Sequence, residues 1–178
     1  MSITKEMRES IRQRADFACE YCGVTETDTG ATLTVDHFQP SVKGGSDNSD
    51  NLIYCCHRCN EYKSDYWPQK SDAPALWNPR REVAKTHFIE SEDGRLIALT
   101  ETGRFTLRRL RLNRLPLIAS RLHRRQKQEE ERLLTRLRDV TRILEHLQIQ
   151  HQVLAKENHA LLLEQRRLLE LLVKQSQP

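Results

Sequence analysis

The sequence contains few aromatic residues and no long apolar run. Phe, Tyr and Trp make up 6% of the 178 residues, and hydrophobic residues of all kinds only 37%. A large aromatic-rich core is therefore not expected. No stretch of 18 apolar residues exists, which excludes a transmembrane helix, and the first residues lack the apolar stretch of a signal peptide. These absences predict a cytoplasmic protein with no membrane partner, part of which is polar helix outside any globular core.

Glycine and proline are absent between Pro116 and Lys174, where helix-forming residues dominate, so this stretch predicts one long helix. Apolar residues recur there every seven residues, with a second series four residues further on, which is typical of a coiled coil. We expect a homodimer, because Asn158 in the second series favours two strands. A helix that folds back on the chain, or that binds a different protein, is the alternative. The two series are Leu133, Val140, Leu147, Leu154, Leu161 and Leu168, and Leu137, Leu144, His151, Asn158, Gln165 and Leu172.

All five cysteines lie between residues 19 and 59, and two pairs have the C-x-x-C spacing. In a reducing compartment this spacing indicates metal rather than disulfides. Cys19, Cys22, Cys56 and Cys59 would offer four thiolates, a closed tetrahedral set, so we expect a structural Zn²⁺. The alternatives are four buried thiols without metal, or Cys55 in place of Cys56, although the spacing favours Cys56.

Two polar segments would be brought together by such a zinc ion. Asp36 and His37 end a β-branched alternating stretch that predicts a strand, while Asn60 and Lys63 follow the second cysteine pair. Carboxylate and amide oxygens suit Mg²⁺, a neutral histidine can take a proton from water, and a lysine can neutralise a phosphate oxygen. This set predicts phosphodiester hydrolysis. The alternative is that Asp36 caps a turn and His37 is simply packed or solvated.

Several short motifs occur in a specific order over this region. They are CEYC at 19–22, VDHFQP at 35–40, GGSD at 44–47, DNL at 50–52 and CHRCNEYK at 56–63. In this order they closely resemble the HNH endonuclease family, in its zinc-containing four-cysteine branch. The resemblance covers roughly residues 12–66. It implies a ββα-metal fold, in which two strands and a helix surround one catalytic divalent ion.

The resemblance also implies roles for single residues. His37 would be the general base that activates water, and Asp36 and Asn60 would be ligands of a catalytic Mg²⁺ or Mn²⁺. Asn51 would hold the loop and orient the base by hydrogen bonds, and Lys63 would contact a phosphate. Many family members have histidine at the position of Asn60, whereas asparagine also occurs in the HNH domains of RNA-guided nucleases. The implied reaction is hydrolysis of a DNA phosphodiester, with 5′-phosphate and 3′-hydroxyl ends.

Positive charge is concentrated between Thr102 and Gln128, where nine basic residues occur without an acidic one. A block of one sign suggests a polyanionic partner, here DNA. The alternative is a solvated helix face, although such a face usually mixes signs. The expected DNA-contacting residues are Arg104, Arg108, Arg111, Arg121, Arg124, Arg125 and Lys127.

The expected architecture is α+β and has three parts: an HNH nuclease domain with structural zinc over 1–70, a β-hairpin with a basic short helix over 71–113, and a long helix over 114–178. The expected function is a metal-dependent DNA endonuclease in a mobile-element or anti-phage defence context, with a protein of a larger system as a further partner. The alternative is a non-catalytic zinc-containing DNA-binding or scaffold module dimerised by its coiled coil. The expected elements are helices at 5–18, 59–66 and 106–112, strands at 31–38, 86–89 and 95–99, and a strand or turn at 51–54.

Overall fold

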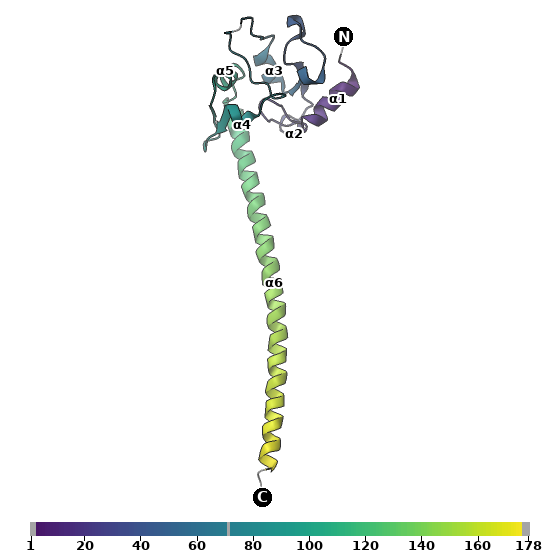
Figure 1. Cartoon of the computed structure of the whole chain (residues 1–178), viewed down its shortest axis with the longest axis vertical. Coiled ribbons are helices and arrows are strands. Elements are labelled where there is room, and N and C mark those ends of the chain that lie inside the picture. The colour runs from purple at the N-terminus through teal and green to yellow at the C-terminus, as the bar shows by residue number, and fades with distance from the viewer. Residues whose placement is uncertain (1–2, 71, 176–178) are drawn as a thin grey trace. The chain divides into compact units, whose positions relative to one another are not determined.

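The computed structural model describes residues 3–70 and 72–175 (Figure 1). The chain divides into two compact units, Met1–Arg125 and Gln126–Pro178, which we describe separately. Within the described residues, no helix combines the length and the apolar character needed to cross a membrane.

The chain begins with helix α1 (Lys5–Arg14), which ends earlier than the sequence predicted. Its N-cap is Thr4, whose hydroxyl oxygen accepts a hydrogen bond from the Met7 backbone N–H at 3.2 Å. Ile11 is buried on the inner face of α1 and packs in a small core cluster with Leu52 and Tyr54. This cluster attaches α1 to the strand that carries Leu52.

The centre of the first unit is a ββα arrangement. Strand β1 (Thr34–His37) pairs antiparallel with β2 (Leu52–Cys55), with His37 opposite Leu52. Helix α3 (His57–Lys63) follows β2 after a single residue, so the end of β2, the second cysteine pair and α3 are directly connected. The predicted ββα order and the α+β class are confirmed. Two 3-10 helices lie between the strands, η1 (Ser41–Lys43) and η2 (Ser49–Asn51).

Two single-turn helices were not expected from the sequence. Helix α2 (Glu26–Thr29) begins with a capping box, in which Thr25 and Asp28 each accept a hydrogen bond from the other's backbone N–H. Helix α4 (Ala84–His87) directly precedes the second pair of strands. Both are too short to show a hydrophobic period, which explains why the pattern did not predict them.

The predicted hairpin is present. Strand β3 (Phe88–Glu90) pairs antiparallel with β4 (Leu96–Ala98), with Ile89 opposite Ile97. Gly94 adopts a positive φ of 76° in the turn between them. This is the left-handed conformation that glycine adopts without steric cost, so Gly94 suits the turn of the hairpin.

The basic short helix starts earlier than predicted. Helix α5 (Glu101–Arg109) has Thr100 as its N-cap, and the Thr100 hydroxyl accepts from the Gly103 backbone N–H at 3.0 Å. Thr106, where the sequence predicted the start of the helix, is instead fully buried inside it. Its hydroxyl oxygen accepts a hydrogen bond from the Trp77 backbone N–H at 2.8 Å, which attaches the irregular segment before α4 to α5.

Helix α6 (Leu115–Gln175) is continuous over 61 residues, which corresponds to about 90 Å at 1.5 Å per residue. The long C-terminal helix is therefore confirmed, and a hairpin that folds back within this stretch is excluded. Whether α6 pairs with another helix stays a prediction.

Candidate metal and active site

The four predicted zinc ligands form one cluster. The sulfur atoms of Cys19, Cys22, Cys56 and Cys59 all lie within 4.8 Å of one another. The cluster lies in the larger core of the first unit, which also contains Trp77. Four convergent thiolates fit a closed tetrahedral zinc site, so this part of the expectation agrees with the geometry.

Cys55, the fifth cysteine, is not part of this cluster. It is fully buried in the last position of β2, and burial raises the pKa of its thiol. Its sulfur atom lies outside the group of four that converge on one point. The alternative pairing through Cys55 is therefore not supported.

A cation lies beside the cysteine cluster. The Arg114 Nη2 is 3.8 Å from the sulfur atoms of both Cys56 and Cys59. Burial disfavours the charged guanidinium, but the thiolates more than offset this and raise the pKa of Arg114. Four thiolates around one Zn²⁺ carry a net charge of −2, which a neighbouring cation stabilises. Sequence reasoning placed Arg114 in a basic block and did not connect it with the metal.

Three of the predicted catalytic residues meet at one surface hollow. Asp36 and His37 come from the end of β1, and Asn60 comes from α3. All three line a hollow of about 510 Å³, which faces solvent. The zinc cluster explains this meeting, because the second cysteine pair leads directly into α3 and holds it next to β1. The remaining lining residues are Pro40, Ser41, His57, Glu61, Ser64 and Asp65.

A second carboxylate contacts the predicted general base. The Nε2 of His37 lies 2.7 Å from Oδ1 of Asp47, which is a hydrogen bond or, if the ring is protonated, an ion pair. An ionised Asp47 favours the neutral tautomer with its proton on Nε2, which leaves the lone pair of Nδ1 free to accept a proton. In the sequence Asp47 is visible only as the last residue of the GGSD motif, and its contact with His37 depends on the fold.

Asn51 holds the loop that carries Asp47. Its Oδ1 accepts a hydrogen bond from the Gln39 backbone N–H at 2.9 Å, and its Nδ2 donates to the carbonyls of Gln39 and Ser46 at 3.1 and 2.8 Å. The loop passes so close to Gln39 that a Cβ at Gly45 would lie 1.8 Å from the Gln39 carbonyl oxygen. This arrangement fits the role of loop support expected of Asn51, acting on His37 through the position of Asp47.

Lys63 occupies a different environment from the one expected. Its side chain is fully buried, and its Nζ lies 2.8 Å from Oδ2 of Asp36, whose side chain is 22% exposed. A fully buried ammonium is not placed to contact a phosphate, so this burial corrects the expected phosphate contact. Instead, Lys63 fixes one carboxylate oxygen of Asp36 and compensates its charge.

The donors at the hollow fit a hard divalent cation. Asp36 has a second carboxylate oxygen besides the one that faces Lys63. Among the described residues, the side-chain amide of Asn60 has no hydrogen-bond partner, so its carbonyl oxygen is available. Carboxylate and amide oxygens are ligands suited to Mg²⁺ or Mn²⁺, and Mg²⁺ usually keeps several waters and takes few protein ligands.

The basic residues expected to contact DNA fall into two groups. Arg121 is only 4% exposed, and its guanidinium donates to the carbonyls of Gly94 at 2.6 Å and Leu112 at 3.0 Å. A guanidinium held by backbone carbonyls inside the protein cannot reach DNA, which corrects the expectation for Arg121. The other six are exposed: Arg104, Arg108, Arg111, Arg124, Arg125 and Lys127.

Comparisons with known proteins agree with this geometry. Residues 19–65 match the family model described as HNH endonuclease. A curated relative, the CRISPR-associated endonuclease Cas9 of Corynebacterium diphtheriae, is 30% identical over 93 residues, which are 51% of this chain and 8% of the relative. The chain therefore spans a small part of that protein's length. No solved structure matches the chain. Residues 19–65 are therefore similar to HNH endonucleases, and they carry four cysteines whose sulfur atoms are placed to bind a metal ion.

Proposed function

We propose that the protein hydrolyses DNA phosphodiester bonds at the hollow between β1 and α3. The observation that carries this proposal is the convergence of Asp36, His37 and Asn60 on one solvent-facing hollow, with Asp47 bonded to the far nitrogen of the histidine. A general base that is oriented by a carboxylate, next to hard metal ligands, is the arrangement needed to activate water against a phosphodiester.

Each residue near the hollow has a separate role in the proposed hydrolysis. Nδ1 of His37 takes the proton of the attacking water, and the Asp47 carboxylate stabilises the imidazolium that results. Asp36 and Asn60 would hold a Mg²⁺ or Mn²⁺ ion, which would supply positive charge to stabilise the scissile phosphate. Lys63 keeps Asp36 in one orientation, and Asn51 keeps the Asp47 loop in place.

DNA binding is assigned to the six exposed basic residues of the block between Arg104 and Lys127. Each phosphate that they neutralise releases counterions, so binding should weaken steeply with salt. Replacement of Arg124 and Arg125 by glutamate should lower DNA affinity most at low ionic strength. Replacement of Arg81, an exposed basic residue outside this block, is the matched control.

A plasmid assay separates cleavage from binding alone. Zinc-loaded full-length protein should nick or linearise supercoiled DNA with Mg²⁺ and should be inactive in buffer without a divalent cation. Asp36→Ala and Asn60→Ala should abolish cleavage, whereas Asn48→Ala should not, because the Asn48 side chain makes no capping bond at the start of η2. Binding without cleavage under every metal condition would instead support the alternative, a non-catalytic DNA-binding or scaffold module.

A further inference from the structure

The second unit presents an apolar seam that is not covered by any described residue. Nine apolar residues of the two heptad series lie on one side of α6, and each is between 52% and 62% exposed. An apolar stripe of this length on an exposed helix indicates a partner surface. The nine are Leu133, Leu137, Val140, Leu144, Leu147, Leu154, Leu161, Leu168 and Leu172.

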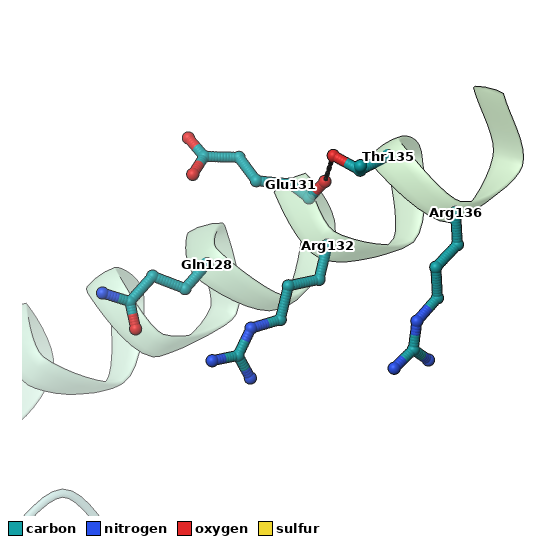
Figure 2. Close-up of a pocket in the computed structure, with 5 residues that line it drawn as sticks. All are labelled: Gln128, Glu131, Arg132, Thr135 and Arg136. Atoms are coloured by element: carbon teal, nitrogen blue, oxygen red, sulfur yellow. Dashed lines mark hydrogen bonds between the residues drawn. The ribbon is translucent and has the colours of Figure 1, made fainter. Parts of the chain in front are cut away.

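Near its start, the outward side of the second unit's helix is polar. Figure 2 shows five side chains, Gln128, Glu131, Arg132, Thr135 and Arg136, along a shallow surface of this helix. They come from one helix alone, and the Thr135 hydroxyl donates to the Glu131 carbonyl oxygen at 2.9 Å. In the heptad register they fall outside the seam. Further along α6, apolar residues outside the two series are also exposed, among them Ile149 and Leu163, so the contrast between the two sides is confined to this first part.

Three polar residues interrupt the seam, and they determine how a second copy can pair with it. His151, Asn158 and Gln165 occupy three successive positions of one heptad series. In a parallel, in-register pair, each of them faces the same residue of the second copy. Asparagine and glutamine can then hydrogen-bond to themselves across the seam, as a neutral histidine can when the two rings adopt matching tautomers. No polar side chain is left against an apolar one.

An antiparallel pair loses this match. Positions of one series then face positions of the other, so Asn158 would face Leu147 and Gln165 would face Val140 of the second copy. An amide buried against an apolar side chain without a hydrogen-bond partner costs about 1–3 kcal/mol, which disfavours this pair. A parallel pair shifted by one heptad also places Gln165 against Leu172. The polar residues therefore select one arrangement.

The seam is large enough for a stable dimer. Burial of one such apolar side chain contributes about 1.5–3 kcal/mol. At about 25 cal/mol per Å², this corresponds to roughly 60–120 Å² of apolar surface removed from water. For nine side chains from each of two helices this amounts to roughly 1,100–2,200 Å², which is the range of stable protein interfaces.

From these observations we propose that α6 binds α6 of a second copy as a parallel, in-register two-stranded coiled coil, specified by the layers at His151, Asn158 and Gln165. Because the first unit precedes the coil in sequence, a parallel pair joins two HNH domains to the same end of the coil. Two such domains at the same end of the coil could each cleave one strand of a DNA duplex. That consequence rests on the proposed function, whereas the pairing itself does not.

Cysteine cross-linking of the zinc-loaded full chain tests the pairing without DNA. Under mild oxidation, Leu161→Cys should form a disulfide-linked dimer, because residue 161 faces its own copy. Lys156→Cys, on the outward side of the helix, is the matched control and should not form a disulfide-linked dimer. The unsubstituted chain shows how much cross-linking the native cysteines give. In a mixture of Leu161→Cys and Leu144→Cys, with a size tag on one, no mixed disulfide should form, since those positions face each other only in the antiparallel pair.

Two further measurements complete the test. Sedimentation equilibrium should give the mass of a dimer, and replacement of His151, Asn158 and Gln165 by leucine should allow the mixed 144–161 disulfide to form. The mass of a monomer or trimer overturns the proposal. A mixed 144–161 disulfide in chains that keep His151, Asn158 and Gln165 also overturns it. A leucine variant that stays wholly parallel overturns the role of the polar layers. Plasmid cleavage can fail while these results hold, so the two proposals fail separately.

Discussion

The buried contact between Lys63 and Asp36 yields a quantitative prediction. At an effective dielectric of 20, two unit charges 2.8 Å apart attract by about 6 kcal/mol, and desolvation offsets much of this gain. Removal of one partner of a buried pair costs about 3–5 kcal/mol. Since Asp36 keeps 22% exposure, we expect Lys63→Met to lower the free energy of unfolding by about 3 kcal/mol, at the lower end of that range.

The assay is a double-mutant cycle with Asp36→Asn as the second change, which removes the charge that Lys63 leaves behind. Urea unfolding of the zinc-saturated chain can be followed through Trp67 and Trp77, both of which lie in the first unit. The two changes should couple by at least about 1.5 kcal/mol, because these residues are in direct contact.

The exposed pair Arg58 and Glu61 is a matched control for this cycle. Its atoms are also close, at 2.9 Å, but the side chains are 65% and 50% exposed, so its coupling should be about 0.3–0.5 kcal/mol. A Lys63–Asp36 coupling no larger than that of the control would refute the view that Lys63 acts by holding Asp36.

Three further predictions concern stability and metal. Arg121→Ala should destabilise the first unit by about 2–4 kcal/mol in chemical denaturation, because two buried carbonyls lose their hydrogen-bond donor. Lys127→Ala, at an exposed position, should change stability by less than about 0.5 kcal/mol. Equal effects of the two changes would contradict the burial of Arg121. Hydrogen bonds from Arg12 and Tyr54 lower the pKa of Glu26 to about 2 from 4.5. Its contribution to stability is therefore present above pH 4.5 and lost as the pH falls toward 2, and Glu26→Gln should flatten the acid limb of the stability profile; an unchanged limb would show that other carboxylates dominate. Elemental analysis should find one zinc per chain, lost in Cys59→Ala together with cooperative unfolding of the first unit; a folded, zinc-free variant would contradict a structural role.

Much of the fold could be predicted because its signals are local in sequence. Two C-x-x-C pairs imply a closed metal site wherever they meet, and the absence of glycine and proline after Pro116 predicts an uninterrupted helix. The meeting of Asp36 with Asn60 followed from the metal that connects their segments. These features need no knowledge of side-chain packing.

The contacts that could not be predicted from the sequence are those between side chains that are distant in the chain and meet only in the fold. The sequence shows Lys63 and Arg121 as basic residues, but it does not show that one faces the partly buried carboxylate of Asp36 and the other faces backbone carbonyls. The start of α5 was set by the hydroxyl of Thr100, whereas the similar hydroxyl of Thr106 bonds to a distant backbone. Asp47 was visible in a motif, but its bond to His37 depends on the folded loop that Asn51 holds.

The most direct test of the central claim is the initial rate of Mg²⁺-dependent plasmid cleavage by His37→Ala, with zinc content and thermal unfolding measured on the same sample. Removal of a general base should reduce the rate by about 10²–10⁴-fold while zinc and folding are retained. His57→Ala, an exposed histidine at the border of the same hollow, should cleave at close to the parent rate. Cleavage by folded, zinc-loaded His37→Ala at the parent rate would contradict the proposed site.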